Sequence, residues 1–101
     1  MNERDLREIR LLRAEAAAVR ELIRAEGEPR VAVRLREHLA VVEARRFELM
    51  AWVLEIPDAR VRCICLMRFV EGKSWETIAR RLHYERTAPG KVVRRWFARR
   101  G

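Results

Sequence analysis

One stretch decides the fold of this chain: residues 71–97 read EGKSWETIARRLHYERTAPGKVVRRWF. The run WETIARRL follows Ser74, and a serine at that place suits a helix cap because its hydroxyl accepts a backbone N–H. The segment HYER forms a short polar turn, and a second run with helical spacing follows it. Two short helices joined by such a turn are typical of a helix-turn-helix motif.

The spacing of apolar residues within this stretch supports the motif. A helix-turn-helix needs a small residue on its first helix, where the second helix crosses closely, and Ala79 is that residue. His83 stands in the turn, where the simplest versions of the motif carry glycine. The positions expected to hold the crossing angle are apolar: Ile78, Leu82, Tyr84, Pro89 and Val92.

Pro89 and Gly90 stand where the second helix should already be under way. A proline in a helix interior removes a hydrogen bond, but the N–H groups of the first turn need no helical partner. If Thr87 caps the helix, Ala88 becomes its first residue and Pro89 its second, a place that proline tolerates. Gly90 then costs about 1 kcal/mol relative to alanine. We therefore expect a second helix that begins about two residues late rather than a broken one.

The residues before this stretch predict three further helices. Gly27 and Pro29 separate a helix over residues 2–26 from one over 29–55, and Asp58 caps a third that ends at Gly72. Apolar stripes with alternating spacings of three and four predict that the first two form an antiparallel hairpin. The stripes are Ile9, Leu12, Ala16, Val19 and Ile23, then Leu35, Leu39, Val42, Leu49, Val53 and Ile56, which Arg46 interrupts.

The expected fold is all-α, with a helical hairpin arm over residues 1–56 and a three-helix domain over 57–101 that contains the helix-turn-helix. The stripes of the arm can pack on each other, on the C-terminal domain, or in a homodimer through residues 1–56, and the sequence leaves these arrangements open. No run of about 18 apolar residues occurs, and the charged start MNERDLREIR lacks an apolar signal core. We therefore expect no membrane segment and a cytoplasmic location.

The net charge of +8 is unevenly placed. Residues 1–57 hold 11 Arg and 11 acidic residues, whereas residues 58–101 hold ten Arg and two Lys against four acidic residues. Six bases and no acid follow Glu85. A neutral part joined to a strongly basic part favours a scaffold that carries a polyanion-binding surface.

Residues 56–84 read IPDARVRCICLMRFVEGKSWETIARRLHY. With this stretch, about residues 55–97 resemble the C-terminal domain of phage transcriptional regulators of the RinA and ArpU type, which is similar to region 4 of bacterial sigma factors. The resemblance implies a DNA-binding regulator of phage or prophage genes with its last helix in the major groove. The chain departs from the family after Tyr84, where it continues with ERTAPGK instead of the family's Ser/Thr-rich helix start. The matching residues are Ile56, Asp58, Arg60, Arg62, Arg68, Phe69, Val70, Glu71, Gly72, Ser74, Trp75, Ile78, Ala79, Leu82, His83 and Tyr84.

Projected at 100° per residue, the last helix turns Pro89, Val92 and Trp96, with Val93 beside them, toward the first motif helix. Its other side is left free for DNA. The candidates for base or groove contacts are Arg86, Thr87, Lys91, Arg94 and Arg95. The candidates for phosphate contacts are Lys73, Ser74, Trp75, Arg99 and Arg100. Trp75 fits the core equally well, and Trp52 and Trp96 are expected in the core.

The sequence offers no enzyme chemistry and no cofactor or metal site. Cys63 and Cys65 point about 200° apart on a helix, so they cannot share a metal and are expected to be small apolar fillers. The function that fits best is a sequence-specific transcriptional regulator that binds double-stranded DNA. The alternative is a protein-interaction module, for RNA polymerase or another partner, with weak or no DNA readout; the Pro89–Gly90 pair is its best support.

Overall fold

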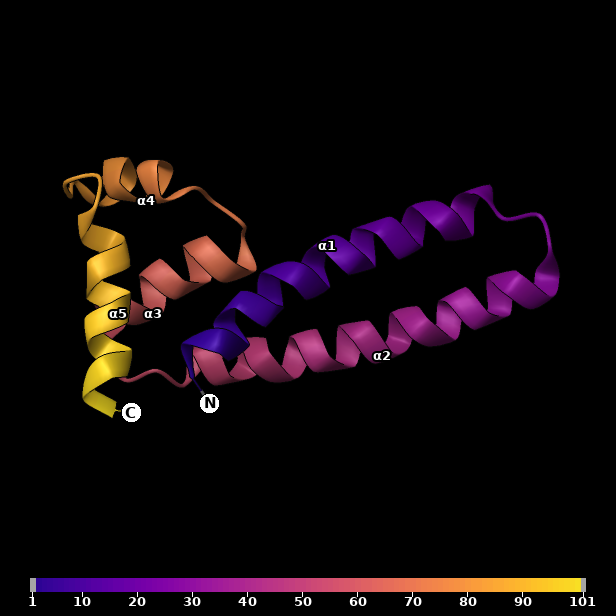
Figure 1. Ribbon diagram of the computed structural model, residues 1–101, viewed down its shortest axis with the longest axis horizontal. Helices are drawn as coiled ribbons and strands as arrows, with labels where there is room; N and C mark the ends of the chain where they lie inside the picture. The colour runs from indigo at the N-terminus through magenta and orange to yellow at the C-terminus, as the bar shows by residue number, and fades with distance from the viewer. Residues whose placement is uncertain (1, 101) are drawn as a thin grey trace.

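The computed structural model describes residues 2–100, and all regular structure in that range is helical (Figure 1). The predicted all-α class is confirmed. The elements are α1 (Glu3–Ala25), α2 (Pro29–Leu54), α3 (Ala59–Cys65), the π-helical segment η1 (Leu66–Val70), α4 (Trp75–Leu82) and α5 (Ala88–Arg100).

Helices α1 and α2 lie side by side and run in opposite directions, and together they form an arm (Figure 1). The predicted apolar stripes pack within the chain, with Ile9, Ala16, Val42 and Leu49 among the buried residues. The two stripes therefore cover each other within the hairpin, with Leu12, Leu35 and Leu39 half-buried between the helices. Leu6, which lies three residues before Ile9, is fully buried as well.

Ion pairs line both flanks of the arm. They join Arg45 to Glu8 at 3.2 Å and Arg20 to Glu43, and a hydrogen bond joins His38 to Glu15 at 2.7 Å. Each pair links α1 to α2 and fixes their register. Exposed pairs of this kind add at most about 1 kcal/mol each, so the buried stripes carry most of the stability of the arm.

The base of the arm shares one hydrophobic core with the rest of the chain. Leu6 and Ile9 of α1 meet Leu49 and Val53 of α2 in a cluster that continues into the later helices. The other members of the cluster are Ile56, Val61, Ile64, Cys65, Met67, Phe69, Ile78 and Val93. The arm is therefore packed into the core at its base, and its far half extends beyond this core (Figure 1).

The third helix begins at the predicted cap, since the Asp58 carboxylate accepts backbone N–H groups from Arg60 at 2.9 Å and Val61 at 3.1 Å. Its last turn widens into η1, where the Glu71 N–H donates to the Leu66 carbonyl at 2.9 Å. Gly72 then turns the chain with φ of 76°, a conformation that suits glycine.

The two cysteines on this element differ from each other. Cys65 is buried and fills the core as expected, but Cys63 is exposed. The expectation that both act as apolar fillers is therefore wrong for Cys63. The two side chains point about 200° apart around the helix, so only one of them can face the core.

Candidate nucleic-acid interface

Helix α4 has well-defined ends. The Ser74 hydroxyl accepts the Thr77 N–H at 3.1 Å, which confirms the predicted cap. At the other end His83 adopts the left-handed conformation, with φ of 58° and ψ of 40°, and the Tyr84 N–H donates to the Ala79 carbonyl at 2.8 Å. This geometry is the usual glycine-type helix stop. The short turn between α4 and α5 requires this conformation, which is strained for a residue with a side chain such as histidine.

Helix α5 begins at Ala88, as the late start predicts. The Thr87 carbonyl accepts the Lys91 N–H at 3.4 Å. Pro89 is the second helical residue, where its missing N–H is not needed, and its side chain is fully buried. The Pro-Gly pair therefore does not interrupt the helix, and Pro89 contributes to the core instead.

The two sides of α5 differ sharply in burial. Pro89 and Val93 are buried, and Val92 and Trp96 are half-buried against the core. The inward side is thus centred nearer Val93 than the projection indicated. Facing away from it are the exposed residues Thr87, Lys91, Arg94, Arg95 and Ala98.

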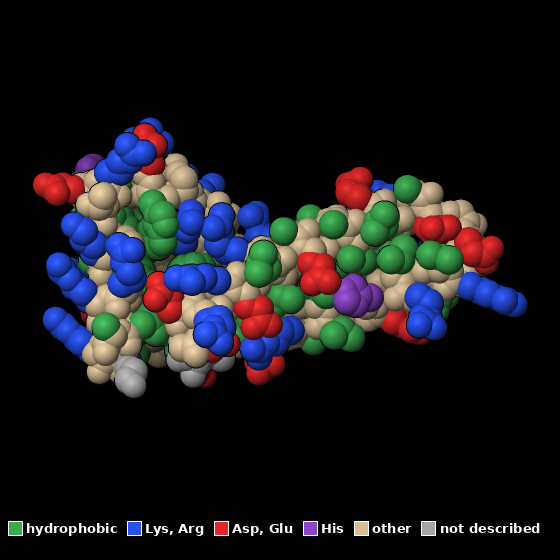
Figure 2. Space-filling view, viewed as in Figure 1, with side chains coloured by type: hydrophobic (Ala, Val, Ile, Leu, Met, Phe, Trp, Pro, Cys, Tyr) green, Lys and Arg blue, Asp and Glu red, His purple; other side chains and the backbone are tan. Residues whose placement is uncertain are grey.

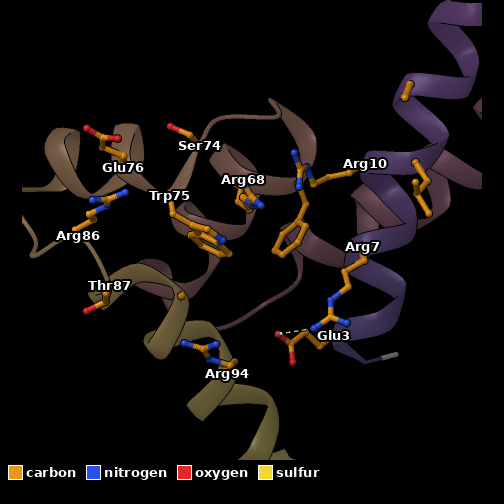
Figure 3. A pocket seen from close by; sticks show the side chains of 14 residues that line it. Glu3, Arg7, Arg10, Arg68, Ser74, Trp75, Glu76, Arg86, Thr87 and Arg94 are labelled. Carbon is orange, nitrogen blue, oxygen red and sulfur yellow. Dashed lines mark ion pairs between the residues drawn. The ribbon is translucent and has the colours of Figure 1, made fainter.

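An open hollow of about 1030 Å³ lies beside the start of α5 (Figure 3). Its wall comes from four elements: α1, η1, the N-terminus of α4, and the start of α5 with the turn before it. The polar lining residues are Glu3, Arg7, Arg10, Arg68, Ser74, Glu76, Arg86, Thr87 and Arg94. Five guanidinium groups against two carboxylates make the hollow attractive to anions.

Trp75 forms part of this wall and also covers the core. Its ring packs edge-on against Phe69, with centroids 6.2 Å apart, and the Arg68 guanidinium lies 4.6 Å from the ring centroid. Gly90 of α5 packs over the same indole, since a Cβ placed there would lie 3.9 Å from it. Trp75 therefore joins η1, α4 and α5 around the hollow.

Arg68 holds the loop before α4, because its guanidinium donates to the Lys73 carbonyl at 3.1 Å. Burial, and to a smaller extent the positive charge of Arg10, lower the pKa of Arg68. A guanidinium remains charged at neutral pH despite such a shift. The side chain therefore keeps a positive charge at the inner wall of the hollow.

The hollow gathers only part of the predicted contact set. Ser74, Trp75, Arg86, Thr87 and Arg94 line it. The remaining candidates lie elsewhere. Lys91 and Arg95 are exposed farther around α5, Lys73 is half-buried, and Arg99 is exposed near the C-terminal end; Arg100 lies 3.6 Å over the ring of Trp96.

Three lining arginines were missed by the sequence reasoning. Arg7 and Arg10 belong to α1, and Arg68 belongs to η1. Their spacing of three residues places Arg7 and Arg10 on one side of α1, but nothing in the sequence says that this side adjoins α4 and α5. Arg7 and Arg10 reach the hollow only because α1 packs on η1, and this tertiary contact cannot be read from the local sequence.

The distribution of charge separates the two ends of the molecule. Lys and Arg side chains crowd over the end formed by α4 and α5, whereas the arm shows both signs mixed with hydrophobic side chains (Figure 2). Within residues 2–100 no three or more His, Cys, Asp or Glu side chains gather where they could hold a metal ion. No described helix is both long and apolar enough to cross a membrane.

Comparison of the chain with protein-family models, with curated proteins and with solved structures found no match.

Proposed function

We propose that this chain is a sequence-specific transcriptional regulator that binds double-stranded DNA. In this proposal α4, the turn and α5 form a helix-turn-helix within a three-helix domain, and α1 and α2 form a hairpin that supports it. The observation that carries the proposal is the polarity of α5. Its inner side is fixed in the core by Pro89 and Val93, and its outer side presents Lys91, Arg94 and Arg95 with no acid among them.

In the proposed complex α5 lies in the major groove, the usual place of the second helix of this motif. Arg94 and Lys91 then face base edges, where an arginine recognises guanine through O6 and N7. Ser74 and the N-terminus of α4 contact a phosphate, as helix N-termini do. The hollow accommodates the adjoining sugar-phosphate strand, and Arg7 and Arg10 reach that strand from α1.

The resemblance to phage regulators of the RinA and ArpU type supports the same function, and it makes RNA polymerase a second proposed partner. The start of α5 at Ala88 supports this function over the alternative, a protein-interaction module with weak or no DNA readout. Pro89 had suggested a lapsed reading helix, but a buried proline in the first turn is compatible with a working one.

A gel-shift titration at stepped salt tests the proposal. Each phosphate contact makes the slope of log affinity against log salt more negative by about 0.9. We expect binding to mixed-sequence duplex that weakens steeply with salt, and tighter binding to sequences selected from a random duplex pool. No binding to any duplex at about 50 mM salt would overturn DNA binding and leave the protein-interaction module as the function.

A further inference from the structure

The arm exposes a second apolar stripe that nothing in the chain covers. Every large hydrophobic side chain that is strongly exposed within residues 2–100 lies on α1 or α2. On α2 a series with alternating spacings of four and three runs along the exposed side of the helix. Its members, all exposed, are Val33, Glu37, Ala40, Ala44, Phe47, Ala51 and Leu54.

This outer stripe has the pattern of a helix-packing seam. A repeat of 3.5 residues keeps one line of side chains facing a partner helix along its whole length. The largest members are the most costly to leave in water: Phe47 is 58% exposed, Leu54 57% and Val33 49%. The inner stripe of α2 already packs on α1, so the outer stripe is free to receive another helix.

We propose that the outer stripe is a homodimer interface in which α2 pairs antiparallel with α2 of a second copy, about a two-fold axis beside Ala44. Two-fold dimers are the commonest symmetric assemblies, and their interfaces must be self-complementary. The proposal does not rest on DNA binding.

The order of residues along the stripe fits this pairing. With the axis beside Ala44, Phe47 faces the small Ala40 of the second copy, and Leu54 faces Val33 of the second copy. The bulky Phe47 therefore meets a small residue, as close packing favours, and Leu54 meets another apolar side chain. A parallel pairing would instead set Phe47 against its own equivalent and Glu37 against its own equivalent, which places like charges together.

Charge along one flank favours the same direction. Arg30 and Arg34 lie in the first turns of α2, and Glu55 follows its last turn. Antiparallel pairing places these arginines beside Glu55 of the second copy at both ends of the interface. Parallel pairing would place arginine beside arginine, so electrostatics and packing select one orientation.

The oligomeric state of the full chain without DNA tests the proposal. We expect dimers at about 100 µM in sedimentation equilibrium. Phe47→Glu should weaken association at least about 100-fold, because each dimer loses two rings and gains two carboxylates at the interface. The matched control is Leu22→Glu, a 55% exposed position on α1 outside the stripe, which should leave association unchanged. Circular dichroism should show that both variants retain their helices.

Two outcomes of that experiment would overturn the interface. One is a monomer at every concentration, which would mean that the outer stripe binds a partner other than a second copy of the chain. The other is equal association of the Phe47→Glu and Leu22→Glu variants.

Crosslinking tests the antiparallel register. In a Cys63→Ser background the remaining Cys65 is buried, so a short bismaleimide reports only introduced cysteines. Ala44→Cys should link two identical chains. Val33→Cys and Leu54→Cys should each fail to link alone, yet link to each other when the two proteins are mixed. Self-linking of both Val33→Cys and Leu54→Cys would overturn the antiparallel arrangement.

Discussion

At the scale of single residues, the proposed interface separates side chains that read bases from side chains that hold phosphates. Arg94 lies on the outer side of α5 and lines the hollow, whereas Arg99 lies near the C-terminal end of the same helix. We expect Arg94→Ala to cost about 1–3 kcal/mol on the preferred sequence and much less on a sequence with one changed base pair.

The matched control for Arg94 is Arg99→Ala, which should weaken binding to both duplexes by the same factor, because a phosphate contact carries no sequence information. Quantitative gel shifts on the selected duplex and its single-base variant measure both effects. Equal losses on the two duplexes for Arg94→Ala would show that it contacts only phosphate.

The two cysteines differ in reactivity for a physical reason. Burial, with a smaller effect of the Glu3 charge, raises the pKa of Cys65 to about 12, whereas Cys63 is exposed. At about pH 8 the folded chain should therefore react with a thiol reagent at one site, and at two sites after denaturation. Cys63→Ser should abolish the reaction of the folded chain, and rapid labelling of two thiols in the native chain would contradict the burial of Cys65.

The same raised pKa has a consequence for stability. Because the folded state holds the Cys65 proton more tightly than the unfolded state, this contribution is fully present below the ordinary pKa of 9.0. It is lost as the pH rises from 9.0 toward about 12. Cys65→Ala should remove this part of the alkaline loss of stability in denaturant titrations.

At the scale of elements, the first turn of α5 offers a stabilising substitution. A Cβ at Gly90 would lie 3.8 Å from an Arg94 nitrogen and 3.9 Å from the Trp75 ring, which are ordinary contact distances. Gly90→Ala should therefore raise the free energy of unfolding by up to about 1 kcal/mol, because alanine loses less backbone entropy in a helix.

Substitution of Gly72 is the control for Gly90→Ala, and its expected effect on stability has the opposite sign. The φ of 76° at Gly72 disfavours any side chain, and a Cβ there would collide with the Arg13 guanidinium. Gly72→Ala should lower the free energy of unfolding in urea titrations followed by circular dichroism. A destabilised Gly90→Ala variant would mean that the start of α5 is more crowded than its contacts indicate.

The element boundaries other than the change from α3 to η1 at Leu66 were predictable, because their causes are local. Ser74, Asp58 and Gly72 each act within one turn of the chain, and the late start of α5 followed from which N–H groups a helix leaves free. What the sequence did not reveal depends on the direction in which a helix faces its neighbours. The exposure of Cys63 and the centring of α5 on Val93 are examples.

At the scale of the whole molecule, the missed part of the site lies where the arm meets the later helices. Arg7 and Arg10 are about 60 residues or more from Ser74 in sequence, yet they line the same hollow. The neutral charge of residues 1–57 concealed them, because acids of the arm, including Glu3 beside Arg7 at 3.8 Å, cancel their positive charge in the sum. Only the packing of α1 on η1 brings the two arginines to the basic end.

This packing makes the arm part of the proposed DNA surface, and the salt dependence of binding can measure its share. Arg10→Ala should reduce the slope of log affinity against log salt by about 0.9 if Arg10 meets one phosphate. Arg24→Ala is the matched control, since Arg24 is also exposed on α1 but lies near its far end, paired with Glu21. The slope for Arg24→Ala should equal that of the unchanged chain. If the two variants instead share one slope, Arg10 does not contact a phosphate, and its side of the hollow does not hold the strand.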